Sequence, residues 1–186
     1  MLEDKRLKES SGIIKKLILD GRIVKPKEGT IKFFMEKSTQ SIAVASRLLE
    51  IEKEENMAAD MWVINSSYYA MFFAAASLLA KFGHAIKTEI GIHRLTYHAL
   101  VHFFVVEDKK LEKHFMEEYK DAVEEANELL QMSERKADEM IKDFGNEMSK
   151  RKIFTYDLGK TAERVKAETS LSRAKNFVKE VERIIG

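Results

Sequence analysis

One stretch of the sequence, Tyr68 to Ala80, constrains the fold more than any other. It spans thirteen residues, and Ser77 is its one interruption. A membrane-spanning helix needs about twenty apolar residues, so this stretch predicts a buried core helix. The full helix is expected from about Met57 to Phe82, with Gly83 as its C′ residue. Because its centre is apolar on nearly every face, it must be surrounded by other helices of the chain or by a second subunit.

The scarcity of helix breakers favours helices elsewhere as well. The 186 residues contain one Pro and no Cys, and 34% of them are charged. A chain without Cys cannot form disulfides, a zinc–thiolate site or a cysteine nucleophile. The N-terminal sequence MLEDKRLKESS lacks the apolar region of a secretory signal. We therefore expect a cytoplasmic, mostly helical protein that does not enter a membrane.

Residues 1–29 are predicted to form an N-terminal arm outside the main domain, which we place at residues 30–186. The arm contains a short amphipathic helix from Leu7 to Leu19, and the sequence DGRIVKPKEGT then ends it. Two roles remain open for the arm: it packs on the body of the protein, or it reaches a partner.

The remaining apolar residues recur at three- and four-residue spacing. Thr30 is the expected N-cap of a second helix. A shorter helix is expected over HRLTYHALVHFFV, a long one of about nine turns from Leu111 to Phe144, and a last one from Lys160 to Ile185. Inward positions assigned in the second and last helices are Phe33, Phe34, Ile42, Ala45, Leu48, Leu49, Val165, Leu171, Ala174, Phe177, Val178, Val181 and Ile184. No strand-like alternation is visible. The predicted fold class is all-α, an antiparallel bundle of four or five helices with a helical arm.

The net charge of +1 hides an uneven distribution. Residues 107–148 carry fourteen acidic and seven basic side chains, and residues 149–186 carry five acidic and ten basic ones. One interpretation is that these regions attract each other within the fold or across a dimer, and we favour it. The other is that the basic segment meets phosphate.

Two groups of side chains invite a functional interpretation. His98 and His102 have the i, i+4 spacing of a two-histidine metal site, but no HExxH or ExxH motif supplies a third ligand. We expect local hydrogen bonding instead, and neither metal nor cofactor. An aromatic cluster, comprising Tyr68, Tyr69, Phe72 and Phe73, lies in the most apolar helix, so core packing is its expected role.

The segment before the last helix, SKRKIFTYDLGKT, is the strongest candidate for a site. Lys150, Arg151 and Lys152 precede Tyr156 and Asp157 close to the expected helix start. Helix N-termini attract anions, and a guanidinium there can hold a phosphate through two hydrogen bonds. On residue chemistry alone, an ordinary basic loop is the alternative.

These segments together resemble the HEPN domain family. The resemblance rests on NSSYYAMFFAAASLLAKFG, then KTEIGIHRLTYHALVHFFV, then RKIFTYDLGKTAERVKAETSLSRAKNFVKEVERII, and it covers about residues 30–186. It is greatest to the small stand-alone archaeal and bacterial members of an uncharacterised protein family. The resemblance implies a bundle of four or more helices that forms a two-fold dimer. We expect that homodimer to bury more than about 1,200 Å² in total.

The resemblance also implies alternatives for function. Many HEPN members are metal-independent ribonucleases with an Arg, four to six residues, then a His; the Arg holds the scissile phosphate and the His assists attack by the 2′-hydroxyl. Some are toxins paired with a small nucleotidyltransferase antitoxin, and others are inactive and bind nucleotide or protein.

Carried over to this chain, the motif arginine is Arg151, and Tyr156 occupies the histidine position. A phenol with a pKa near 10 is protonated at neutral pH and is a poor general base, and losing the base costs a factor of about 10² to 10⁴ in rate. A second family histidine is replaced by Glu89, although His93 lies four residues away.

The expected function is therefore a HEPN-like dimer that binds nucleotide, RNA or a nucleotidyltransferase partner. Arg151, Tyr156, Lys150, Lys152 and Asp157 would form its polar patch. An endoribonuclease that uses Arg151 with Tyr156 or a nearby His is the alternative, and a purely structural helical oligomer is the second alternative.

Overall fold

The protein is described by a computed structural model that covers residues 4–55, 59–88, 91–128 and 160–186. In chain order the elements are α1 (Asp4–Leu19), β1 (Ile23–Val24), α2 (Thr30–Glu55), α3 (Asp60–Lys81), β2 (Ala85–Ile86), α4 (Ile92–Leu100), the π-helix η1 (Val101–Glu107), a helical segment over residues 113–128, and α6 (Lys160–Ile185). The all-α prediction is confirmed. The part of the long predicted helix beyond residue 128 lies outside the described residues.

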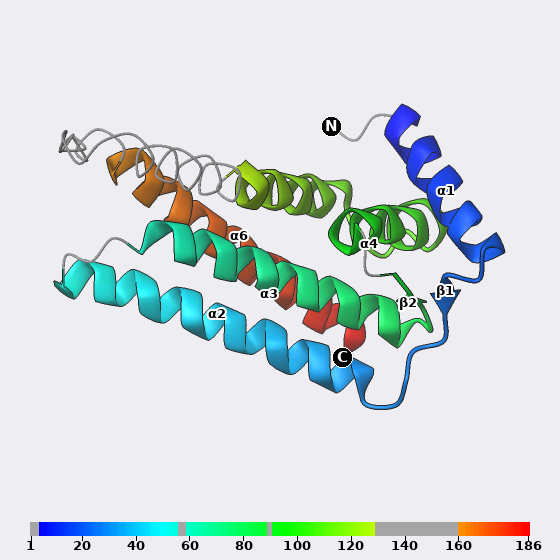
Figure 1. The fold of residues 1–186 in the computed structure, drawn as a ribbon, viewed down its shortest axis with the longest axis horizontal. Coiled ribbons are helices and arrows are strands. Elements are labelled where there is room, and N and C mark those ends of the chain that lie inside the picture. Colours follow the sequence, from blue (N-terminus) through cyan, green and yellow to red (C-terminus); the bar gives the residue numbers. More distant parts are fainter. Residues whose placement is uncertain (1–3, 56–58, 89–90, 129–159) are drawn as a thin grey trace, which may run out of the picture.

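Three long helices form the base of the fold (Figure 1). α3 runs antiparallel to α2 and packs extensively against both α2 and α6. The shorter helices α4 and η1 and the segment 113–128 lie over α3, and α1 packs across α4 and η1. Of the two roles left open for the N-terminal arm, its helix takes the first: it packs on the body, with Ile14 and Leu17 in the main core.

Two glycines with positive φ set the ends of the long hairpin. The Gly83 N–H donates to the Ala80 carbonyl, and the next N–H, of His84, reaches back to the Leu79 carbonyl. With Gly83 at φ +85°, this is the predicted C′ position in a Schellman motif. The hairpin starts with α2, whose first helical residue is Thr30, but the Phe33 N–H donates to the Gly29 carbonyl. Gly29, not Thr30, therefore holds the N-cap position.

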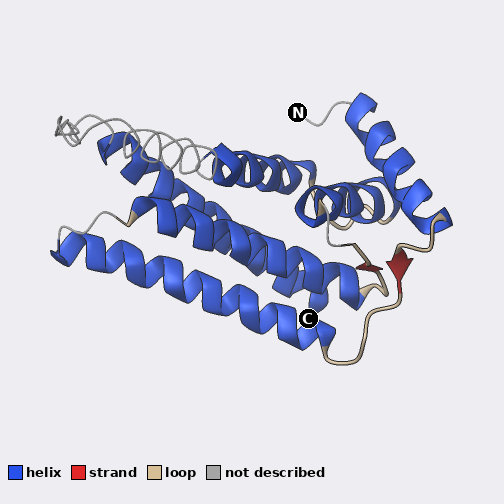
Figure 2. Ribbon diagram, in the orientation of Figure 1, coloured by secondary structure: helices blue, strands red, loops and turns tan. Residues whose placement is uncertain are grey.

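A two-stranded antiparallel ladder, absent from the sequence prediction, ties the two ends together (Figure 2). Ile23 pairs with Ile86, and Val24 pairs with Ala85. The Lys87 N–H adds a hydrogen bond to the Arg22 carbonyl. Strands of two residues are too short to show apolar alternation, so no sequence pattern announces them. The ladder anchors the chain between α1 and α2 to the chain between α3 and α4.

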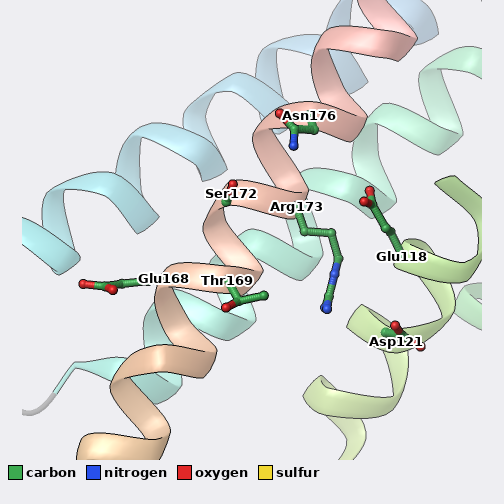
Figure 3. Close-up of a pocket in the computed structure, with 7 residues that line it drawn as sticks. All are labelled: Glu118, Asp121, Glu168, Thr169, Ser172, Arg173 and Asn176. Carbon is green, nitrogen blue, oxygen red and sulfur yellow. The ribbon is translucent and has the colours of Figure 1, made fainter. Parts of the chain in front are cut away.

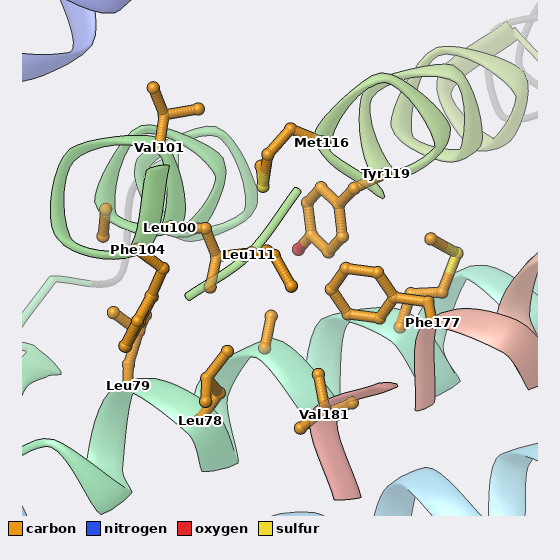
Figure 4. Packing of buried hydrophobic residues seen from close by; sticks show 14 of the residues in the cluster. Leu78, Leu79, Leu100, Val101, Phe104, Leu111, Met116, Tyr119, Phe177 and Val181 are labelled. Carbon is orange, nitrogen blue, oxygen red and sulfur yellow. The ribbon is translucent and has the colours of Figure 1, made fainter. Parts of the chain in front are cut away.

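The main core lies where α3, α4, η1, the segment 113–128 and α6 converge (Figure 4). Its largest fully buried side chains include Phe104, Met116, Tyr119 and Phe177. The Tyr119 hydroxyl is buried and forms no hydrogen bond within the described residues. Burial raises the pKa of that phenol well above its usual value, so Tyr119 stays neutral in the core.

Some large apolar side chains of α2, α3 and α6 are exposed in the described part of the chain, and here the sequence predictions fail in part. Phe33 is 53% exposed and Val165 is 59% exposed, although both were assigned inward. In the aromatic cluster Tyr68 is buried as predicted, whereas Tyr69 is 43% exposed. The three- and four-residue spacing shows that a helix has an apolar stripe, but it does not show how much of that stripe the neighbouring helices bury.

α3 is also the described helix that is long and apolar enough, by length and composition, to cross a membrane. Of its most apolar window, 67% is buried inside the protein. Such burial is typical of a core helix.

Candidate functional site

The polar patch predicted from the sequence lies outside the described residues. Lys150, Arg151, Lys152, Tyr156 and Asp157 all fall within residues 129–159. Glu89 also falls outside the described part of the chain. The roles assigned to these residues therefore stay predictions, and the site described below is built from other side chains.

The His98–His102 pair binds the N-terminal arm. Ser10 Oγ and His98 Nδ1 are 3.0 Å apart, and Ser11 Oγ and His102 Nδ1 are 3.2 Å apart. The prediction that these hydrogen bonds are local in the sequence is therefore wrong, because each bond joins α1 to the α4–η1 helix. Burial lowers the pKa of both imidazoles, and Arg94 lowers that of His98 further. Both rings are neutral near pH 7, so they dock α1 without adding buried charge.

Ser11, His102 and Glu107 lie in a row that resembles a nucleophile, a base and its orienting acid, although only Ser11 is hydrogen-bonded to His102. His102 Nε2 lies 3.3 Å from Glu107 Oε1, and the π-helical register of η1 places these two residues, five apart, on one side. Ser11, however, lies within α1, where the backbone N–H groups are occupied by the helix itself. These N–H groups cannot form an oxyanion hole. We therefore interpret the Ser11, His102 and Glu107 side chains as fastening the arm rather than as catalysing acyl transfer.

A pocket of about 340 Å³ lies between α1, α4 and residues 113–128; we call it the α1–α4 pocket. Its lining consists of Arg6, Glu9, Ser10, Arg94, Tyr97, His98, Lys120, Val123, Glu124 and Asn127. Ser10 and His98 are buried, while Arg6 and Arg94 are exposed. The pocket therefore has a buried polar floor and exposed guanidinium groups at its rim.

The charges in this pocket are unevenly neutralised. Lys120 is paired with Glu124 at 3.0 Å. Within the described residues, neither Arg6 nor Arg94 forms an ion pair. Among the described lining residues, one carboxylate, Glu9, remains to oppose two guanidinium groups, so this lining is cationic overall. These charges act on the floor: Arg94 lowers the pKa of His98, and Arg6 opposes the rise that burial causes in the pKa of Tyr97.

A second depression, the α6 hollow, lies between residues 113–128 and α6 (Figure 3). It has a volume of about 470 Å³, and its charged lining residues are Glu118, Asp121, Glu168 and Arg173. Arg173 Nη1 donates to Glu125 Oε2 at 3.2 Å, and Ser170 Oγ donates to the same oxygen at 2.6 Å. Arg173, the one cation among the described lining residues, is thus already occupied, and the carboxylates around it repel anions.

His93 lies beside the aromatic residues of α3. Its ring centroid is 4.3 Å from that of Phe72, and the rings of Tyr68 and Tyr69 also contact it. Its Nδ1 atom is buried and has no hydrogen-bond partner among the described residues. Burial lowers the pKa of His93, so a neutral imidazole that can accept a proton is present near pH 7.

The described residues contain no group of three His, Cys, Asp or Glu side chains arranged to hold a metal ion. The α1–α4 pocket was missed by the sequence analysis, although Arg94, Tyr97 and His98 share one helix face at i, i+3 and i+4. That spacing in the sequence could have indicated the α4 side of the pocket. The sequence could not have indicated Arg6, because its place at the pocket depends on how α1 docks.

Comparison with known proteins adds no relative: no family model matches the chain, and no curated protein matches it. The resemblance to HEPN domains therefore rests on the sequence segments alone. Helical content is consistent with it but is shared by many unrelated folds.

Proposed function

We propose that this protein is a HEPN-like helical dimer that binds nucleotide, RNA or a partner protein such as a nucleotidyltransferase. The observation that carries the proposal is a group of exposed aromatic side chains on one face of α3, as seen among the described residues. Trp62 and Tyr69 are 58% and 43% exposed on this face, and Phe72 and Phe73 are half-buried beside them. Contiguous exposed aromatic residues of this kind mark interaction surfaces.

The composition of the face favours a second copy of the chain as its occupant. Between Asp60 and Lys81, the twenty intervening residues of α3 carry no charge. In a two-fold dimer the same patch of each subunit meets across the interface, so any charge on it would lie near an identical charge of the other subunit. A patch without charge escapes this repulsion. A ring contact between Phe73 and Phe34, with centroids 6.1 Å apart, extends the patch from α3 to α2.

Light scattering on single substitutions tests the dimer. We expect the unmodified protein to be a dimer at micromolar concentration and Tyr69→Asp to be a folded monomer. Leu19→Asp is the matched control, because Leu19 is 87% exposed but lies on α1. A monomeric unmodified protein, or a dimer that survives both Trp62→Asp and Tyr69→Asp, would contradict the proposal.

The ligand part of the proposal concerns Arg151. We expect Arg151→Ala to abolish RNA or nucleotide binding by the segment 150–157 without unfolding the protein. Arg151→Lys recovers little, because an ammonium cannot reproduce the two-point contact of a guanidinium. A structural oligomer predicts the opposite pattern: unchanged ligand binding, together with a lower melting temperature or a dissociated dimer. Thermal melts, sizing and a nucleotide titration on both variants separate the two.

His93 favours endoribonuclease as a second candidate function. Its neutral imidazole with an unpartnered Nδ1 is a suitable general base. Cleavage would require no metal and leave a 2′,3′-cyclic phosphate. We expect His93→Ala to abolish such cleavage, Tyr156→Phe to reduce it, and Tyr156→His to raise it. His114→Ala, at an exposed histidine paired with Glu112, is the control. Absence of cleavage by both the unmodified protein and Tyr156→His would exclude this candidate.

A further inference from the structure

We infer that the α1–α4 pocket binds the phosphate group of a small phosphorylated molecule, of the class of nucleoside monophosphates. Arg6 and Arg94 would hold the phosphate, and His98 would complete its hydrogen bonds. The inference deepens the nucleotide-binding part of the proposed function and rests on it for the ligand class. None of the pocket residues belongs to the segment 150–157.

The first argument is that two guanidinium groups at one pocket lack protein partners. Four other arginines are each paired with a carboxylate: Arg47 with Glu50, Arg164 with Glu168, Arg173 with Glu125 and Arg183 with Glu180. Arg6 and Arg94 form no ion pair within the described residues, and they approach the pocket from different helices. Guanidinium groups from two sides can each form a two-point contact with one phosphate.

The second argument is the fixed floor of the pocket. Ser10 is fully buried and holds His98 Nδ1 at 3.0 Å, so the imidazole has one defined orientation. Nε2 has no hydrogen-bond partner among the described residues. In the tautomer where Ser10 donates to Nδ1, Nε2 carries the hydrogen and can donate it to a phosphate oxygen. A floor positioned by buried hydrogen bonds is what a specific binding site requires.

The third argument concerns size and the non-ionic lining. About 340 Å³ lies at the lower end of the range for small-molecule pockets, so the pocket suits a mononucleotide rather than a duplex or a folded RNA. The half-buried ring of Tyr97 and the side chain of Val123 offer apolar surface, and the Asn127 amide offers both a donor and an acceptor. Apolar walls with a few convergent polar groups are typical of small-molecule pockets.

Calorimetric titration of the full chain provides the test. The probes are adenosine 5′-monophosphate, ribose 5-phosphate, inorganic phosphate and, as the uncharged control, adenosine. We expect the monophosphate to bind at least about tenfold more tightly than adenosine, since hydrogen bonds to charged groups are the strong ones. Ribose 5-phosphate binding as tightly as the nucleotide would assign the site to sugar phosphates and overturn the nucleotide class.

Substitutions locate the site. Arg94→Ala and Arg6→Ala should each weaken binding of the monophosphate about tenfold or more. Arg47→Ala, at an exposed arginine on α2, should change nothing. Both pocket arginines are exposed, so neither substitution threatens the fold. Unchanged affinity in both pocket variants would overturn the inference.

Two further outcomes separate this inference from the proposed function. Binding lost in Arg151→Ala but kept in Arg94→Ala would overturn the pocket while supporting the segment 150–157. Binding lost in Arg94→Ala but kept in Arg151→Ala would support the pocket alone. Proton NMR adds an independent readout: the monophosphate should shift the imidazole signals of His98 and leave those of exposed His114 in place. A shift confined to His114 would contradict the inference.

Discussion

The α6 hollow and the α1–α4 pocket flank the same helical segment, residues 113–128, yet they use arginine in opposite ways. In the α6 hollow, Arg173 is 14% exposed and is held by Glu125, which also accepts a hydrogen bond from Ser170. In the α1–α4 pocket, Arg6 and Arg94 stand at the rim without ion-pair partners in the described chain. The first arrangement joins two helices, and the second leaves charge available to a ligand.

This difference shows why a count of arginines near a hollow says little about binding. A paired, largely buried guanidinium is already satisfied, and removing its partner leaves a buried charge. An unpaired guanidinium at a rim costs the fold almost nothing and keeps its donors free. The larger of the two hollows is thus the poorer candidate site, because its described lining holds three carboxylates and one cation that is already paired.

The largest expected effect follows from removing the structural arginine. Arg173→Ala should lower the free energy of unfolding by about 2 kcal/mol, because Glu125 is then left half-buried without its counter-charge. Arg94→Ala should change it by less than about 0.5 kcal/mol, as is usual for surface substitutions. Urea denaturation of both variants checks the pair of values. Equal losses in the two variants would erase the distinction between the hollows.

A smaller effect is expected at the floor of the α1–α4 pocket. Ser10→Ala leaves His98 Nδ1 buried without a partner and should cost about 1 kcal/mol. Ser11→Ala is the matched control, because Ser11 is only half-buried and its bond to His102 is longer. Urea denaturation of the two variants compares the losses. A Ser11→Ala variant that loses more stability would show that the arm is held chiefly at η1 rather than at the pocket.

The sequence predicted the elements of the fold better than its surfaces. The end of α6 at Ile185 and the C′ position of Gly83 follow from local signals. The exposure of Phe33 and Val165 could not be predicted, because it depends on which neighbours cover each helix. The α1–α4 pocket has the same origin: Ser10 and His98 are 88 residues apart, and only the docking of α1 brings them together.

The pH dependence of stability sharpens the comparison further, with a smaller effect. Burial and the nearby Arg94 hold the pKa of His98 below that of an imidazole in the unfolded chain, near 6.5. As the pH falls below about 6.5, the unfolded state binds more protons than the folded state, so stability decreases until the pH passes the folded-state pKa. We expect thermal melts of Arg94→Ala to lose less between pH 7 and pH 5 than those of the unmodified protein. A steeper loss in this variant would contradict the assignment of Arg94 to His98.

The smallest expected effect comes from the one carboxylate that opposes the pocket arginines. Glu9 is exposed at the pocket, and its charge raises the pKa of His98, against the larger effects of burial and Arg94. If Arg6 and Arg94 hold a phosphate, Glu9→Gln removes a like-charge repulsion and should tighten binding of adenosine 5′-monophosphate about two- to threefold, since exposed charge pairs are worth well under 1 kcal/mol. Glu168→Gln in the α6 hollow should leave the affinity unchanged, because Glu168 is paired with Arg164 and lines the other depression. Salt should diminish the Glu9 effect, because added ions screen exposed charges. Tighter binding in Glu168→Gln but not in Glu9→Gln would place the phosphate in the α6 hollow and contradict its assignment to the α1–α4 pocket.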